Sequence, residues 1–282
     1  MISRVTLDTT QLFDGTLSGQ KWLPLSIDGL NFPQIVYSSK DKGGADGRIL
    51  TIGGYGGLNI SMEWMIIGSS FSDFVTQRDA FIGLWGTIIS DGAKYLKVSR
   101  ANGKNIQLLI KGVEISGQVD AMSPVSCKML LTLKTEYPFV VGQTLNSQDV
   151  ELFNGGGFEI PFAIPFDMSN GGDSEVTITN NGNVYAYPVL RVYGPLTNPT
   201  VSNNTLGQTL SISTTIADGK YLEIDTFYRT AILYSGATNY RQYLSGDFIK
   251  LTPGENLVRL TGSGDGANTK LVVEFRDHYL NV

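Results

Sequence analysis

Cysteine and histidine are almost absent from this chain, whose 282 residues include only Cys127 and His278 of these two types. One cysteine cannot form an intrachain disulfide. One cysteine with one histidine cannot supply the set of ligands that holds a structural zinc ion. We therefore expect no disulfide framework, no metal site and no bound cofactor.

Charge and long apolar segments are also scarce. Charged residues make up 17% of the chain, and the formal net charge of −5 is the opposite of what a duplex-binding protein needs. No apolar run approaches the ~20 residues that span a bilayer. The first residues, MISRVTLDTTQLFDG, lack the apolar core of a secretory signal. The sequence thus predicts neither a duplex-binding protein nor a membrane protein, and no Sec-type export.

Glycine, in contrast, is abundant, with 33 residues, and much of it follows Asp or Asn. Such pairs favour tight hairpin turns because glycine adopts positive φ without steric cost. They begin at Asp14, Asp28, Asp46, Asp91, Asn102, Asn154, Asn170, Asn181, Asp218 and Asp265. Such frequent turn signals are typical of a fold made of many short strands.

Between the turns, apolar and polar residues alternate with the period of a β-strand. Residues 94–100 and 105–115 flank one such turn and predict a hairpin. In 126–139, alternation places Cys127, Met129, Leu131 and Leu133 on one face. Further strands are expected within 174–180, 208–216, 220–226, 229–236 and 255–262. The sequence predicts a mainly β fold.

One segment, SSFSDFVTQRDAFIGLWGTI (69–88), has helical periodicity instead. Ser70 or Ser72 is a suitable N-cap, Asp73 lies in the first turn, and Gly86 is a plausible stop. The apolar positions of one face are Phe74, Phe81, Leu84 and Trp85. We expect a single amphipathic helix packed on a sheet.

Chain length and the distribution of strand-like segments predict two domains, because 282 residues exceed one average domain. A polar, glycine-rich stretch follows Tyr137-Pro138, and strand-like patterning resumes at Phe158. We assign the first domain to 1–140, a linker to 141–157 and the second domain to 158–282.

No catalytic constellation stands out. The glycine-rich stretch 43–57 lacks the phosphate-loop order and is interpreted as hairpin tips. The acidic stretch 167–175 does not match a calcium loop and is interpreted as a connection, with weak calcium binding as the alternative. The carboxylate pairs Glu136/Glu151 and Asp173/Glu175 carry no information without a fold. His278 could act as a base only beside a nucleophile, and the sequence contains no G-x-S-x-G motif to supply one. We therefore expect a lone surface histidine and no enzyme.

The stretch 180–201 raises a different possibility, because Tyr185, Tyr187 and Tyr193 lie close to several asparagines and Arg191. Aromatic rings with amide and guanidinium donors could bind a sugar. The alternative is a sandwich strand with its turns. Pro188 then indicates an edge strand or a bulge, since proline cannot donate to a ladder. Asn181-Gly182 is predicted to be a tight turn.

Several segments of the second half resemble the second domain of the distal tail proteins of siphoviruses. They are GGGFEIPFAIPF (155–166), TITNNGNVYAYPVLRVYGPLTNPTV (177–201), YLEIDT (221–226) and FIKLTPGENLVRLTG (248–262). The first half resembles the first domain of that family more loosely. The segments there are DGR (46–48), LNISMEWMIIG (58–68), LWGTIISDGAKYLKVSR (84–100) and EYPF (136–139).

The resemblance implies a structural role in the virion, at the tip of a phage tail. Family members have a split β-barrel-like first domain with a helix and a galectin-like β-sandwich as second domain. Six copies form a ring that joins the tail tube protein to a tail-tip hub or tail-associated lysin. The tape measure protein and a receptor-binding protein are the further partners implied. DNA passes through the ring without specific binding, and the protein is made in the host cytoplasm.

A second function class competes with this hub: a carbohydrate-binding module that recognises host cell-wall polysaccharide. A galectin-type sugar site needs a His, Asn, Arg, Trp and Glu set, and residues 158–282 contain no tryptophan. We therefore favour the hub, and interpret the tyrosines of 180–201 as sandwich surface. No binding residue is assigned from the sequence.

Overall fold

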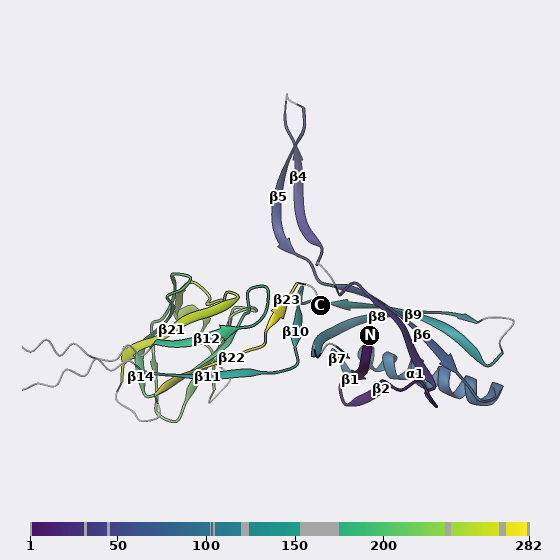
Figure 1. The fold of residues 1–282 in the computed structure, drawn as a ribbon. Helices are drawn as coiled ribbons and strands as arrows, with labels where there is room; N and C mark the ends of the chain where they lie inside the picture. Colours follow the sequence, from purple (N-terminus) through teal and green to yellow (C-terminus); the bar gives the residue numbers. More distant parts are fainter. Residues whose placement is uncertain are drawn as a thin grey trace, which may run out of the picture. The chain divides into compact units, whose positions relative to one another are not determined.

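The computed structural model describes residues 2–30, 33–43, 46–101, 103, 105–119, 124–152, 175–234, 238–264 and 269–280. The chain forms two compact units (Figure 1). The first unit contains Met1–Gln143 with Tyr279–Val282, and the second contains Thr144–His278. A strand, β11 (Asn146–Glu151), occupies part of the stretch 141–157 that the sequence assigned to a linker, and it belongs to the second unit.

A large sheet forms the body of the first unit. Its strands are β1 (Ile2–Leu7), β2 (Thr10–Phe13), β3 (Trp22–Asp28), β6 (Asn59–Ile67), β7 (Lys94–Arg100), β8 (Asn105–Val119), β9 (Ser126–Thr135), β10 (Val140–Gly142) and β23 (His278–Tyr279). Neighbours follow the order β2-β1-β7-β8-β9-β6-β3, and β10 pairs with β8 and β23. The boundary between the units falls within β23, because His278 belongs to the second unit and Tyr279 to the first. The predicted hairpin of 94–115 is confirmed, because β7 pairs antiparallel with β8.

Strand β9 shows how alternation builds the core of this unit. Cys127, Met129, Leu131 and Leu133 are all buried, as the sequence predicted for one face of the strand. Strand β6 pairs with β9 and buries its own alternate residues, which are Ile60, Met62, Trp64 and Ile66. Because successive side chains point to opposite faces of a sheet, both strands contribute to the same apolar layer.

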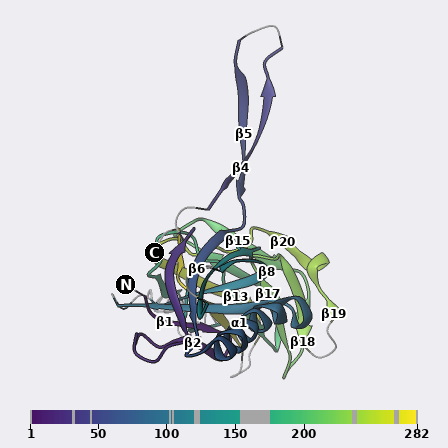
Figure 2. The same ribbon diagram turned by 90° about the vertical axis from the view of Figure 1, so that its right-hand side faces the viewer.

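The helix α1 (Phe71–Asp91) lies against β6 and β8 of this sheet (Figure 2). Of the two candidate N-caps, Ser70 fills the role, since the backbone N–H of Asp73 donates to its hydroxyl at 3.2 Å. The prediction that the helix stops at Gly86 is wrong. Trp85 and Ile88 are both buried, and their packing outweighs the ~1 kcal/mol that a glycine costs inside a helix.

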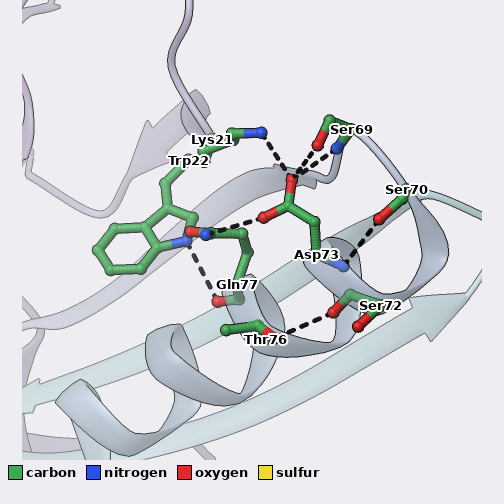
Figure 3. Close-up of polar contacts among 8 residues, drawn as sticks. All are labelled: Lys21, Trp22, Ser69, Ser70, Ser72, Asp73, Thr76 and Gln77. Atoms are coloured by element: carbon green, nitrogen blue, oxygen red, sulfur yellow. Dashed lines mark hydrogen bonds and ion pairs between the residues drawn. The ribbon is translucent and has the colours of Figure 1, made fainter.

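Asp73 anchors the start of α1 to Lys21, the residue that precedes strand β3 (Figure 3). Its carboxylate accepts from the Lys21 ammonium at 2.7 Å, and from the amide and hydroxyl of Ser69 at 2.7 Å each. Gln77 donates to the other carboxylate oxygen at 3.2 Å, and the Gln77 carbonyl accepts from the indole N–H of Trp22. The Lys21 hydrogen bond is the largest cause that lowers the pKa of Asp73. The network is internally satisfied and serves the fold.

Two sheets form the second unit. The first contains β11, β13 (Val189–Tyr193), β17 (Tyr221–Asp225), β18 (Thr230–Tyr234), β19 (Thr238–Asn239) and β22 (Lys270–Phe275), in the order β11-β22-β13-β17-β18-β19. The second contains β12 (Glu175–Asn180), β14 (Leu196–Asn203), β15 (Gln208–Ile212), β16 (Thr215–Ile216), β20 (Leu244–Gly246) and β21 (Gly254–Ser263). Its order is β12-β21-β14-β15-β20, with β16 paired to β14. A 3₁₀ turn, η1 (Arg241–Tyr243), precedes β20.

Residues of both sheets share one apolar core in the second unit. Leu190, Leu222 and Val273 from one sheet, and Val201 and Leu260 from the other, are completely buried. This arrangement is a β-sandwich. The mainly β prediction is confirmed for the chain as a whole, and α1 is the one α-helix among the described residues.

The stretch 180–201 differs from its prediction at Pro188. Strand β13 begins immediately after Pro188 and lies between β22 and β17, so the expectation of an edge strand is wrong. Pro188 sits outside the ladder, where its carbonyl accepts from the Thr226 hydroxyl at 2.7 Å. Gly182 is required for close approach: a Cβ there would lie 2.2 Å from the carbonyl oxygen of His278.

Candidate interaction sites

A separate two-stranded hairpin is the most exposed feature of the first unit. It consists of β4 (Ile35–Asp41) and β5 (Arg48–Tyr55), which pair only with each other among the described strands. In Figures 1 and 2 it extends away from the large sheet. The sequence placed hairpin tips within 43–57, and Gly47, at φ 104, lies next to the tip pair of Asp41 and Arg48.

Large apolar side chains are more numerous on one face of the hairpin than on the other, where Val36 and Ile49 are the exposed ones. Paired residues share a face, and one face carries Ile35, Tyr37, Leu50, Ile52 and Tyr55. The exposed fractions at its centre are 62% for Tyr37, 63% for Leu50 and 74% for Ile52. A two-stranded hairpin is at best marginally stable in water, and clustered exposed apolar side chains mark interaction surfaces. This face, which we call the arm face, is therefore a candidate docking surface.

Aromatic contacts hold the base of the arm. Tyr55 meets Phe139 edge-on, with ring centroids 5.6 Å apart, and Phe139 meets Tyr137 in the same way at 5.6 Å. Phe139 is buried. The EYPF segment (136–139) thus joins the exposed arm to the packed body of the unit.

The second unit contains a pocket of about 320 Å³, formed by segments that are far apart in the sequence. Its lining residues are Tyr187, Gln208, Thr226, Phe227, Arg229, Gly246, Asp247, Phe248 and Lys250. Three of these residues are aromatic and five carry polar or charged side chains, and the volume is within the roughly 300–1,000 Å³ of small-molecule sites. Tyr187, one of the tyrosines of 180–201, is part of this wall.

Positive charge gathers at the pocket. The Lys250 ammonium lies 5.7 Å from the centre of the Tyr187 ring. The guanidinium groups of Arg229 and Arg241 lie 5.8 and 4.8 Å from the centre of the Phe248 ring. In the part of the chain that the structure describes, no ion pair joins these three cations to a carboxylate. Asp247 is the single acidic residue of the lining.

Hydrogen bonds fix the loops that form the pocket. The Asp225 carboxylate accepts from the amides of Phe227 and Tyr228 at 2.9 and 2.8 Å. Arg229 then adopts a φ of 56°, a conformation that is uncommon for residues other than glycine. On the opposite wall, the amide of Lys250 donates to Oε1 of Gln208 at 2.9 Å.

A row of three tyrosines crosses three adjacent strands of the first sheet of this unit. The rings of Tyr193 and Tyr221 lie 5.0 Å apart, and those of Tyr221 and Tyr234 stack at 4.6 Å. Because each ring covers the face of its neighbour, the row presents few free faces to a ligand. Burial is the main cause that raises the pKa of Tyr221. Tyr193 therefore serves as surface packing, as the sequence suggested.

Arg191, the cation of the 180–201 stretch, is fully engaged. Its guanidinium donates to Glu223 at 2.8 Å and to Glu274, which lie on the two strands that flank β13. The hydrogen bond to Glu223 is the first cause that raises the pKa of Arg191. This cation links three strands and is not available for a ligand.

The prediction that His278 lies on the surface is wrong. Its side chain is 4% exposed, and its Nδ1 lies 2.9 Å from the carbonyl oxygen of Tyr185. Burial lowers the pKa of His278 to about 4, although the Tyr185 carbonyl opposes the shift. The neutral ring with a proton on Nδ1 satisfies this contact. His278 is therefore a buried structural residue that contacts Tyr185 and Tyr187 of the second unit.

The remaining candidates from the sequence do not assemble into a site. Glu136 pairs with Lys111, and Glu175 accepts from Asn204. The possible calcium loop of 167–174, with Asp173, lies outside the described residues, as does the segment GGGFEIPFAIPF (155–166). Within the described ranges, no cluster of three His, Cys, Asp or Glu residues could hold a metal ion. No helix there is long and apolar enough to span a membrane.

Comparison with known proteins shows similarity to phage tail components over part of the sequence and over the fold. Residues 181–279 match the family model described as siphovirus-type tail component, C-terminal domain. The comparison with curated proteins gave no match.

Two solved structures are similar over nearly the whole chain. One is the Dit protein (gp 19.1) of phage SPP1, described as a paradigm of the hub adsorption apparatus in phages that infect Gram-positive bacteria. It has a TM-score of 0.60 and 12% identity, with 98% of each chain covered. The other is a chain of the phage P2 baseplate, with a TM-score of 0.50, 12% identity and 100% of each chain covered. At this identity the structural matches establish a shared fold.

The family match falls on the unit that contains the pocket, and the shared fold covers both units. The printed descriptions of these matches are of a siphovirus-type tail component, a Dit protein and a baseplate chain. Residues 181–279 are therefore similar to the C-terminal domain of siphovirus-type tail components, and the whole chain shares the fold of the SPP1 Dit protein.

Proposed function

We propose that six copies of this chain form a closed ring at the tip of the tail tube. The ring joins the tail tube protein to the tail-tip hub or tail-associated lysin, anchors receptor-binding components, and leaves a central channel for DNA. Ring-forming residues belong to the first domain, and the galectin-like second domain carries outward-facing functions. The protein is made in the host cytoplasm and incorporated into the virion.

The arm face carries this proposal. Tyr37, Leu50 and Ile52 are more than half exposed in a single chain, and burying one such side chain contributes roughly 1.5–3 kcal/mol. An arm that docks on a different surface of the next copy makes a heterologous contact. Contacts of that kind generate a ring when the rotation closes. A second copy of the chain is therefore the proposed occupant.

The charge of the chain is compatible with a DNA channel. A net charge of −5 does not favour the counterion-releasing contacts that would hold DNA. A ring that must let DNA pass has no use for a strongly basic lining.

Light scattering coupled to size-exclusion chromatography tests the ring, with a matched pair of arm variants. Ile52→Ser removes an apolar side chain from the arm face. Ile49→Ser makes the same change on the opposite face of β5, where Ile49 pairs with Lys40. We expect a mass of six chains for the parent protein and for Ile49→Ser, and loss of that species for Ile52→Ser. A protein that stays monomeric at high concentration, and that also fails to bind tail tube or tip proteins, would contradict the proposal.

A further inference from the structure

We propose that the pocket of the second unit binds an anionic saccharide, a sugar unit that carries a phosphate or carboxylate group. The inference concerns the carbohydrate function that the sequence left as the alternative, and it does not depend on ring formation. It rests on the aromatic walls, the unpaired cations and the fixed loops of one pocket.

The aromatic walls suit the apolar face of a pyranose ring. Tyr187 and Phe227 meet edge-on with centroids 5.4 Å apart, so each ring holds the other in place. Phe248 forms a further wall. A volume of about 320 Å³ is small for a polypeptide segment and suits one sugar unit with its substituent. Size therefore favours a saccharide over a peptide.

The charges favour an anion. Arg229 and Lys250 line the pocket and Asp247 opposes them, which leaves one excess positive charge, and Arg241 on Phe248 adds another. Elsewhere in the same unit, Lys270 is paired with Asp149. Cations that have no ion pair among the described residues, in a chain of net charge −5, are groups on which a phosphate or carboxylate gains charge-assisted hydrogen bonds.

The remaining polar groups can serve sugar hydroxyls. Oε1 of Gln208 is occupied by the Lys250 amide, and its Nε2 has no hydrogen bond to any described residue, which leaves amide donors for a ligand. The Asp247 carboxylate supplies an acceptor for hydroxyl groups. Donors and acceptors at one site distinguish a polyhydroxylated ligand from a simple anion.

The pocket exists before a ligand arrives. Asp225 fixes the loop that leads to Arg229, as described above. Gly246 permits the other wall to approach β15, since a Cβ on it would lie 2.2 Å from the carbonyl oxygen of Thr209. A preformed site loses little conformational freedom on binding. Measurable affinity for a single sugar unit is therefore expected.

Saturation-transfer NMR on the full chain, followed by titration, tests the proposal. The probes are glucose 6-phosphate, glucuronate, glucose, inorganic phosphate and a short acidic peptide. We expect at least one anionic sugar to bind with a dissociation constant of about 1–10 mM. Glucose and phosphate should each bind at least about tenfold more weakly, because each keeps only part of the contacts. The two sugar anions distinguish a phosphate from a carboxylate as the charged group.

Two variants of equal charge locate the binding. Lys250→Gln removes a lining cation and should weaken binding of the anionic sugar roughly tenfold. Lys220→Gln makes the same change away from the pocket lining and should leave binding unchanged. Amide exchange in β22 verifies that the second unit of each variant is folded. As a second readout, binding of the anionic sugar should weaken with added salt while that of glucose should not.

Four outcomes overturn the inference. They are no binding of either anionic sugar, equal binding of glucose and its phosphate, equal binding of phosphate alone, and equal effects of the two lysine variants. Preferential binding of the acidic peptide at Lys250 would assign the pocket to a protein partner and would also overturn it. Each of these experiments measures ligand binding and none measures oligomeric state. Failure of the ring proposal would therefore leave these results unchanged.

Discussion

Acidification should destabilise the second unit through His278. A histidine with a lowered folded-state pKa favours the neutral form in the native protein. The unfolded chain then takes up a proton near pH 6.5, whereas the folded chain does so only near pH 4. The stability linked to this residue is thus complete above pH 6.5. It is lost progressively as the pH falls from 6.5 towards 4.

The magnitude follows from the two pKa values. The difference between 6.5 and about 4 corresponds to a total of about 3 kcal/mol below pH 4. Between pH 7.5 and 5.5 the expected loss is about 1 kcal/mol, roughly a tenfold change in the opening equilibrium. Carboxylates titrate mostly below this window, at pKa values of about 4. The histidine is therefore the main contributor that this linkage predicts in the second unit.

Amide hydrogen exchange, corrected for intrinsic rates and read by mass spectrometry, separates the two units. Protection in β22 and β13 should fall about tenfold from pH 7.5 to 5.5 in the parent protein. The variant His278→Gln has no titrating side chain, so its protection in these strands should not change with pH, whatever its absolute stability. Strands β6 and β9 of the first unit provide the internal control. An equal pH response in parent and variant, or none in the parent, would refute the reasoning.

Three further experiments test the fold. Ser70→Ala should destabilise the first unit by about 0.5–2 kcal/mol through loss of the N-cap of α1. Ser72→Ala should be nearly neutral, and an equal effect on urea unfolding followed by tryptophan fluorescence would disprove the cap assignment. Cys127 is buried, and burial raises its pKa. Its thiol should therefore react with a disulfide reagent only after unfolding, and rapid labelling of the native protein would contradict this. Gly246→Ala should destabilise the second unit by more than Gly207→Ala, measured by exchange in β15, because both glycines have positive φ but only Gly246 has a carbonyl within 4 Å.

The positions of the tryptophans make the fluorescence measurement on the Ser70 and Ser72 variants specific for the first unit. All three, Trp22, Trp64 and Trp85, lie in the first unit, and two of them contact Phe81 of α1 at 5.4 and 5.5 Å. Trp85 is also within 6.1 Å of that ring. Their fluorescence thus reports on the packing of α1 and is silent on the second unit.

Local pattern was sufficient to predict the strands whose one face is buried. Strand β9 alternates cleanly because a single core covers Cys127 and Leu133 alike. The end of α1 was not predictable in this way, since Gly86 is a stop signal locally and only the burial of Trp85 and Ile88 overrides it. His278 was misplaced for the same reason: nothing near it in sequence indicates that residues 182–187 cover it.

The pocket lay beyond the reach of sequence reasoning. Its lining comes from four separate segments, represented by Tyr187, Gln208, Arg229 and Lys250. These segments meet only after β17, β18 and β20 have paired in their sheets. The arm face was similarly hidden, because its apolar residues become one surface only through the register of β4 with β5. Tyr187 was considered as a sugar contact, but its partners could not be identified.

The two units also differ in how the chain is divided between them. The first unit takes its residues from both ends of the chain, 1–143 and 279–282, whereas the second is one continuous segment. Along the sequence, segments of the first unit therefore lie on both sides of the second. We expect that a replacement of the second unit has to preserve two junctions, at 143/144 and 278/279. A protein that simply ends at residue 143 would lack part of the first unit, so a graft between related tail proteins should retain residues 279–282 with the recipient body.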